Sequence, residues 1–187
     1  MKEKFEYTLN AIHYSLWLLD IKLGDSIRKV TRLMLLPIPK LFFTDNFRKK
    51  YYANLQEGRK QLEKFYYDKR NGAHICSAHH SFGFFYSGYP ACLMFMLWRI
   101  ADGIFGGLSS LTLILIGAIP IGIAYVPAYK AVFSNDRYLQ YFKLFEKEDE
   151  QWHKKWKRRA IAFCIGGTIV SLVGGIGAME LIGLLFF

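Results

Sequence analysis

Long apolar stretches alternate with charged stretches along this chain, and the apolar ones gather in its second half. Two of them are residues 104–126, which contain no charged side chain, and residues 160–187, which contain only that of Glu180. A run of about 20 apolar residues has the length that spans the hydrocarbon core of a bilayer as a helix. The pattern therefore predicts an all-α integral membrane protein.

A third, weaker apolar stretch precedes these two. Residues 82–98 form 17 residues without a charge, and Arg-Ile-Ala-Asp-Gly follows before the next apolar stretch begins. Such a stretch lies at the short end of what can span a bilayer. We predict a transmembrane helical hairpin over residues 82–126, with its tight turn at Arg99–Gly103, and a final transmembrane helix over residues 160–187.

The charged stretches set the expected topology. Residues 1–81 hold 15 Lys/Arg against 8 Asp/Glu, and residues 134–159 hold 8 against 5. Excess Lys/Arg marks cytoplasmic segments, so an even number of crossings should separate the two regions. We therefore expect about three transmembrane helices in a multi-pass protein, with the N-terminus cytoplasmic and the C-terminus on the opposite side.

Residues 1–81 are expected to form a cytoplasmic or interfacial helical region. Apolar residues recur at steps of three and four over residues 8–35, until Pro37 and Pro39 follow, which is the pattern of an amphipathic helix. It can pack on its own neighbours, lie in the membrane interface or pair with another chain. Charges interrupt its first apolar stretch, so we expect no signal peptide.

The connector, residues 127–159, is basic and amphipathic. Tyr138, Phe145 and Trp152 are seven residues apart, and basic residues crowd its end. An aromatic face beside Lys and Arg suits a helix at the lipid headgroups. Packing of this face on the N-terminal helices is the alternative.

Small residues recur at intervals of four in the apolar stretches, as in helices that approach each other closely in lipid. The residues expected at such helix–helix contacts are Gly103, Gly107, Gly167, Ser171 and Gly175. The contacts can lie within one chain or between copies, and we expect a homo-oligomer or a larger membrane complex.

Three charged residues lie near the expected ends of the spans. Arg99 and Asp102, three residues apart, are expected to form an ion pair at the headgroups, and Glu180 to reach the outer interface. The alternative for all three is a place in a pore.

Chemically reactive side chains cluster at one place, just before residue 82. His74, Cys76, His79 and His80 are candidate metal ligands. Their spacing matches no established metal motif and lacks acidic partners, so we expect no cofactor and assign no catalytic residue. No phosphate-binding loop, dinucleotide fingerprint or hydrolase motif occurs in the sequence.

The composition adds one constraint on partners. The net charge of +10 fits the positive-inside bias and attraction to anionic lipid headgroups, without requiring nucleic acid. The predicted function is a non-enzymatic membrane component that self-associates or docks a partner, with pore formation or membrane perturbation as one form of it. The alternatives are a metal- or haem-binding membrane enzyme subunit and an accessory subunit of a transporter or secretion complex.

Overall fold

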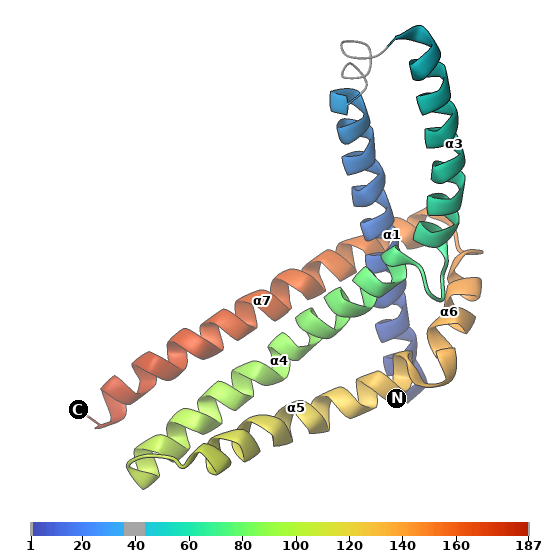
Figure 1. Cartoon of the computed structure of the whole chain (residues 1–187). Helices are drawn as coiled ribbons and strands as arrows, with labels where there is room; N and C mark the ends of the chain where they lie inside the picture. Colours follow the sequence, from blue (N-terminus) through green and yellow to red (C-terminus); the bar gives the residue numbers. More distant parts are fainter. Residues whose placement is uncertain (1, 36–43, 187) are drawn as a thin grey trace. The chain divides into compact units, whose positions relative to one another are not determined.

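The computed structural model describes the backbone of residues 2–35 and 44–186, and every element in these two ranges is helical. The all-α prediction is confirmed for this part of the chain. In order, the helices are α1 (Lys2–Leu35), α3 (Asp45–Tyr67), α4 (Ala73–Phe105), α5 (Ser110–Val132), the short 3₁₀ helix η1 (Ser134–Asp136), α6 (Arg137–Phe145) and α7 (Glu150–Phe186) (Figure 1).

The chain divides into two compact units. The bundle unit comprises residues 1–15 and 80–187, and the hairpin unit comprises residues 16–79. Helices α1 and α4 each contribute residues to both units. The two units are described separately below.

Within the bundle unit, α4 and α7 approach each other through glycines. A Cβ built on Gly88 would lie 2.5 Å from the carbonyl oxygen of Gly167, and one on Gly167 would collide with the carbonyl oxygen of Phe85. Two turns further along α7, a Cβ on Gly174 would lie 2.6 Å from the Cα of Cys92. Because larger side chains would keep the two backbones apart, these glycines permit the close packing typical of helices in lipid.

The turn between α4 and α5 lies later than predicted. Arg99–Gly103 is helical, and the chain reverses at Gly106–Ser109, where Gly106 and Gly107 adopt positive φ angles of 66° and 129°. A positive φ costs little only for glycine, so the Gly-Gly pair is the better turn. Ser109 then caps α5 by accepting a hydrogen bond from the backbone N–H of Thr112.

An aromatic cluster closes one end of the bundle unit. We call it the aromatic cap; it comprises Tyr7, His13 and Tyr14 of α1, Tyr138, Phe142 and Phe145 of α6, and Trp152 and Trp156 of α7. The rings of Phe142 and Phe145 are fully buried. Two alternatives were open for the aromatic face of the connector, the lipid headgroups and the N-terminal helices. In the structure this face packs on the start of α1.

The connector is not one continuous helix: residues 127–132 belong to the end of α5, and η1, α6 and the start of α7 follow. Asn135 and Asp136 adopt left-handed conformations, with φ of 56° and 53°, and α6 ends at Phe145. Asp149 then accepts a hydrogen bond of 2.7 Å from the backbone N–H of Trp152, which caps a new helix. That helix, α7, continues into the last apolar stretch, so the expected boundary at residues 159 and 160 lies inside one continuous helix.

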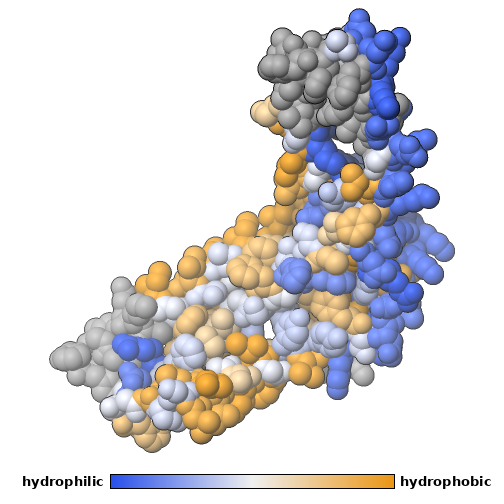
Figure 2. Space-filling model, in the orientation of Figure 1, coloured by the Kyte–Doolittle hydropathy of each residue, from blue (hydrophilic) through white to orange (hydrophobic). Residues whose placement is uncertain are grey.

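Among the described residues, two helical segments are long and apolar enough to cross a membrane, Ser110–Phe145 and Glu150–Gly177. Only 11% and 17% of their most apolar windows are buried within the protein, whereas a core helix of a soluble protein is mostly buried. Hydrophobic residues gather over α5 and along α7 on the face shown in Figure 2. These two helices are consistent with a membrane location.

Candidate functional site

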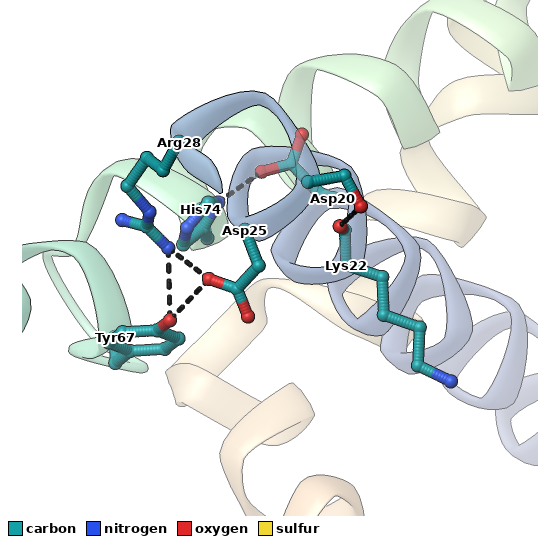
Figure 3. Close-up of polar contacts among 7 residues, drawn as sticks. Asp20, Lys22, Asp25, Arg28, Tyr67 and His74 are labelled. Atoms are coloured by element: carbon teal, nitrogen blue, oxygen red, sulfur yellow. Dashed lines mark hydrogen bonds and ion pairs between the residues drawn. The ribbon is translucent and has the colours of Figure 1, made fainter. Parts of the chain in front are cut away.

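One group of polar side chains in the hairpin unit surrounds His74. This residue lies in the first turn of α4 and is buried. Its Nδ1 lies 2.5 Å from Oδ2 of Asp20 in α1 (Figure 3). The hydroxyl of Ser77 donates a hydrogen bond of 2.7 Å to the other carboxylate oxygen. The carboxylate of Asp20 therefore ties α1 to the beginning of α4.

A second polar group lies one turn further along α1. The hydroxyl of Tyr67 donates a hydrogen bond of 2.6 Å to Asp25, while Arg28 contacts both Asp25 and the Tyr67 hydroxyl (Figure 3). The Tyr67 hydroxyl, followed by the Arg28 guanidinium, lowers the pKa of Asp25 below its ordinary value. The group is exposed, so it contributes modestly to holding the end of α3 against α1.

The surroundings of His74 favour a structural role over a catalytic one. A histidine that acts as a base needs its second ring nitrogen open to a substrate. The Nε2 atom of His74 is buried, with no hydrogen-bond partner among the described residues. A Cβ built on Gly24 would lie 2.5 Å from the ring, so α1 covers the imidazole directly.

The four candidate metal ligands are not gathered into a site. His74 is buried against Asp20, Cys76 and His80 are exposed, and His79 is half-buried. Successive helical residues point in directions about 100° apart, which separates His74 from the other three. In the described part of the chain, no three His, Cys, Asp or Glu side chains lie close enough together to hold a metal ion.

Two of the three expected span-end charges are described. Arg99 and Asp102 form the expected ion pair, with 3.7 Å between the guanidinium nitrogen and the carboxylate oxygen, one turn before the end of α4. The side chain of Glu180 lies outside the described residues, although its backbone belongs to α7. Its expected place at the outer interface stays a prediction.

The expected helix-contact residues have different surroundings. Gly167 packs against α4, whereas a Cβ on Gly107 or Gly175 would meet nothing within 4 Å. Gly107 belongs to the turn, Gly103 lies in the last turn of α4 and Ser171 is half-buried in α7. Within the chain, Gly167 shares its contact face with Gly174 rather than with Gly175.

An apolar groove lies between α4 and α5. Its volume is about 690 Å³, and its walls include Tyr86, Pro90 and Leu93 of α4, Pro120 and Ile123 of α5, and Phe163 of α7. Both ends of the α4–α5 pair are fixed by hydrogen bonds to backbone carbonyls. The Tyr86 hydroxyl donates to Ala124 (3.0 Å), and the Trp98 indole N–H donates to Leu113 (2.8 Å).

The aromatic cap has a marked effect on one ionisable group. Burial, with a smaller effect of Glu146, raises the pKa of Tyr14 to about 12. The ring of His13 lies between four aromatic rings, those of Phe82, Phe133, Tyr138 and Phe142, at centroid distances of 5.4 to 5.6 Å. The cap is a packed core that fixes the ends of the long helices.

The sequence predicts the partner of the connector only as one of two alternatives, and it offers no prediction of the groove. Tyr7 and Tyr14 are seven residues apart, as are Tyr138 and Phe145, and this matching period was a usable signal for their contact. Pro90 and Pro120 each lie in the middle of an apolar stretch and line the groove, but a proline in an apolar stretch is a weaker signal for a groove.

No family model, no curated protein and no solved structure matches this chain.

Proposed function

We propose that this protein is a non-enzymatic integral membrane component that assembles with further copies or with a partner in the bilayer. The observation that carries the proposal is the exposure of the apolar windows of α5 and α7. In water, exposed apolar surfaces of this extent would cause nonspecific aggregation. In a bilayer the same surfaces face acyl chains.

In the proposed topology α4, α5 and α7 each cross the membrane. Lys130, at the end of α5, and the basic run of Lys154, Lys155, Lys157, Arg158 and Arg159 in α7 belong to the cytoplasmic side. The turn at Gly106–Ser109 and the C-terminus then lie on the opposite side. The glycine contacts and the backbone hydrogen bonds of Tyr86 and Trp98 support α4 as a member of this bundle.

The hairpin unit is proposed to contact anionic headgroups. Residues 16–79 contain 13 Lys/Arg and 6 Asp/Glu, which gives +7 of the total net charge of +10. Helix α1 also exposes Leu23, Ile27, Val30 and Met34, spaced by four, three and four residues. An apolar stripe on a basic helix is typical of binding at an anionic membrane surface.

Assembly is proposed to use the side of α7 that carries Gly175. Gly167 and Gly174 are occupied by contacts with α4, whereas an added Cβ at Gly175 would meet nothing within 4 Å. This position therefore remains open to a helix from another chain, in the manner of small residues at membrane helix interfaces.

Substitution of three glycines in α7 tests the proposal. Gly175→Leu should reduce crosslinked oligomer in isolated membranes about fivefold while leaving the melting temperature of the monomer unchanged. Gly177→Leu is the matched control, because Gly177 is equally open but points away from Gly175 on the helix. Gly167→Leu should instead destabilise the chain itself, since overpacking costs about 1–3 kcal/mol or more.

The experiment has two outcomes that contradict the proposal. One is an absence of crosslinked species from the unsubstituted protein, both with itself and with a captured partner. The other is an equal loss of oligomer for Gly175→Leu and Gly177→Leu. If assembly also forms a pore, overexpression should slow growth, and Gly175→Leu should relieve that effect while the protein still inserts.

A further inference from the structure

The groove between α4 and α5 is bounded at each end by a hydrogen bond between the two helices. The hydrogen bonds of Tyr86 and Trp98 fix the two helices at either end of the groove. Between these ends, Pro90 and Pro120 face the groove, and each ring removes a backbone N–H from its helix. The two helices are therefore tied together at both ends of the groove, and the groove lies between these ties.

The groove has the size and the chemistry of a site for a hydrocarbon chain. Its volume of about 690 Å³ falls within the range of roughly 300–1,000 Å³ usual for ligand sites. Its walls are apolar and aromatic side chains, and the Tyr86 hydroxyl that borders it is already bonded to Ala124. An apolar occupant therefore fits better than a polar one.

Two basic side chains, those of Arg159 and Lys130, lie beyond one end of the groove, on the faces of α7 and α5 that line it. Arg159 precedes Phe163 by four residues, which places it on the same face of α7, roughly 6 Å along the axis. Lys130 follows Ile123 by seven residues, two turns of α5 and roughly 10 Å along its axis. Both lie beyond the end marked by Tyr86, whose ring lies 6.5 Å from that of Phe163.

The position of Arg159 is fixed by an aromatic neighbour. Its guanidinium carbon lies 4.6 Å from the ring centroid of Trp156, a buried residue of the aromatic cap. Stacking of this kind holds an arginine in place while leaving its N–H groups able to bind phosphate. The end of the groove is thus positively charged, and the groove itself is apolar.

We propose that the groove binds one acyl chain of an anionic phospholipid whose phosphate is bound by Arg159 and Lys130. The lipid would occupy the space between α4 and α5 and stiffen their packing. This inference rests on the proposed membrane location but not on assembly. It assigns a specific lipid site in the bundle unit, separate from the general attraction of the hairpin unit to anionic headgroups.

The test is native mass spectrometry of the full chain released from nanodiscs of equal parts phosphatidylglycerol and phosphatidylcholine. We expect one retained phosphatidylglycerol per chain, favoured about tenfold over phosphatidylcholine. Arg159→Gln combined with Lys130→Gln should remove the preference for phosphatidylglycerol. Ile123→Trp should remove the retained lipid by filling the groove.

Ile114→Trp is the matched control for groove filling. Ile114 is on the same helix and is 66% exposed, against 71% for Ile123, but it does not line the groove. Equal retention of the two lipids by the unsubstituted protein, or equal lipid loss in both tryptophan variants, overturns the proposal. So does a dimer that Ile123→Trp converts to monomer, because the groove would then hold a second copy.

Failure of this inference is distinguishable from failure of the proposed function. Oligomers appear in the same spectra, so lipid retention and assembly are measured on the same sample. A protein that assembles but shows no lipid preference contradicts the groove site alone. A protein that cannot be incorporated into nanodiscs contradicts both proposals.

Discussion

Single residues decide how the hairpin unit closes around His74. The imidazole is buried beneath α1 because Gly24 presents no side chain at the point of contact. The carboxylate of Asp20, one turn earlier in α1, contacts Nδ1 of the same ring. The fit therefore depends on the missing Cβ at Gly24 and on the contact between the His74 Nδ1 and Asp20.

Gly24→Ala should destabilise the hairpin unit by about 1–3 kcal/mol, the usual cost of overpacking a filled site. The reason is that the new Cβ would lie 2.5 Å from the His74 ring. Thermal or chemical denaturation followed by circular dichroism measures the effect.

Gly58→Ala is the control for the change in helix propensity. Gly58 lies within α3, and a Cβ there would meet nothing within 4 Å. Alanine should therefore stabilise the protein by about 0.5–1 kcal/mol. Stabilisation by Gly24→Ala as well would show that α1 does not cover His74.

The candidate site at His74 could be predicted only in part from the sequence. A cluster of His and Cys was visible, but its members are spaced by two, three and one residues, which a helix spreads around its axis. The partner of His74 is Asp20, 54 residues earlier. Such a contact has no local signal, because it depends on how the helices fold back on one another.

At the scale of whole elements, the aromatic cap is the main packed core of the bundle unit. Phe142 and Phe145 are fully buried among rings from α1 and α7. Asn10 adds a hydrogen bond of 3.0 Å from its side-chain amide to the carbonyl oxygen of Ala131. Helices α1, α5, α6 and α7 thus meet at one place.

Phe142→Ala should destabilise the bundle unit by about 3–5 kcal/mol, because it removes a ring from a filled core. Leu144→Ala, two residues later on the exposed side of α6, should change stability by less than about 1 kcal/mol. Melting temperatures in mild detergent compare the two variants. Similar values for both would contradict the packing of α6 on α1.

The elements themselves were largely predictable, and the differences have local causes. The apolar and charged runs predicted the helices and the absence of strands in the described ranges. The sequence predicts the hairpin turn at Arg99–Gly103 because charges there interrupt the apolar run. The helix continues instead, since Arg99 and Asp102 pair across one turn and Gly106-Gly107 supply the positive φ angles.

For the molecule as a whole, we propose that α5 and α7 cross a membrane. Their apolar surfaces are exposed, and the basic residues lie in the segments that adjoin them. In the proposed topology the turn before α5 lies outside, and the connection between α6 and α7 lies inside with residues 1–81.

The most direct measurement labels single cysteines on intact cells with a membrane-impermeant thiol reagent, in a chain whose own three cysteines are replaced by serine. Ser110→Cys, at the start of α5, should be labelled, while Lys147→Cys and Asn71→Cys should be labelled only after permeabilisation. All three positions are exposed in the structure, so burial within the protein does not limit the reaction. Equal labelling of Ser110→Cys and Lys147→Cys on intact cells would show that α5 does not cross the membrane, and would contradict the proposed topology.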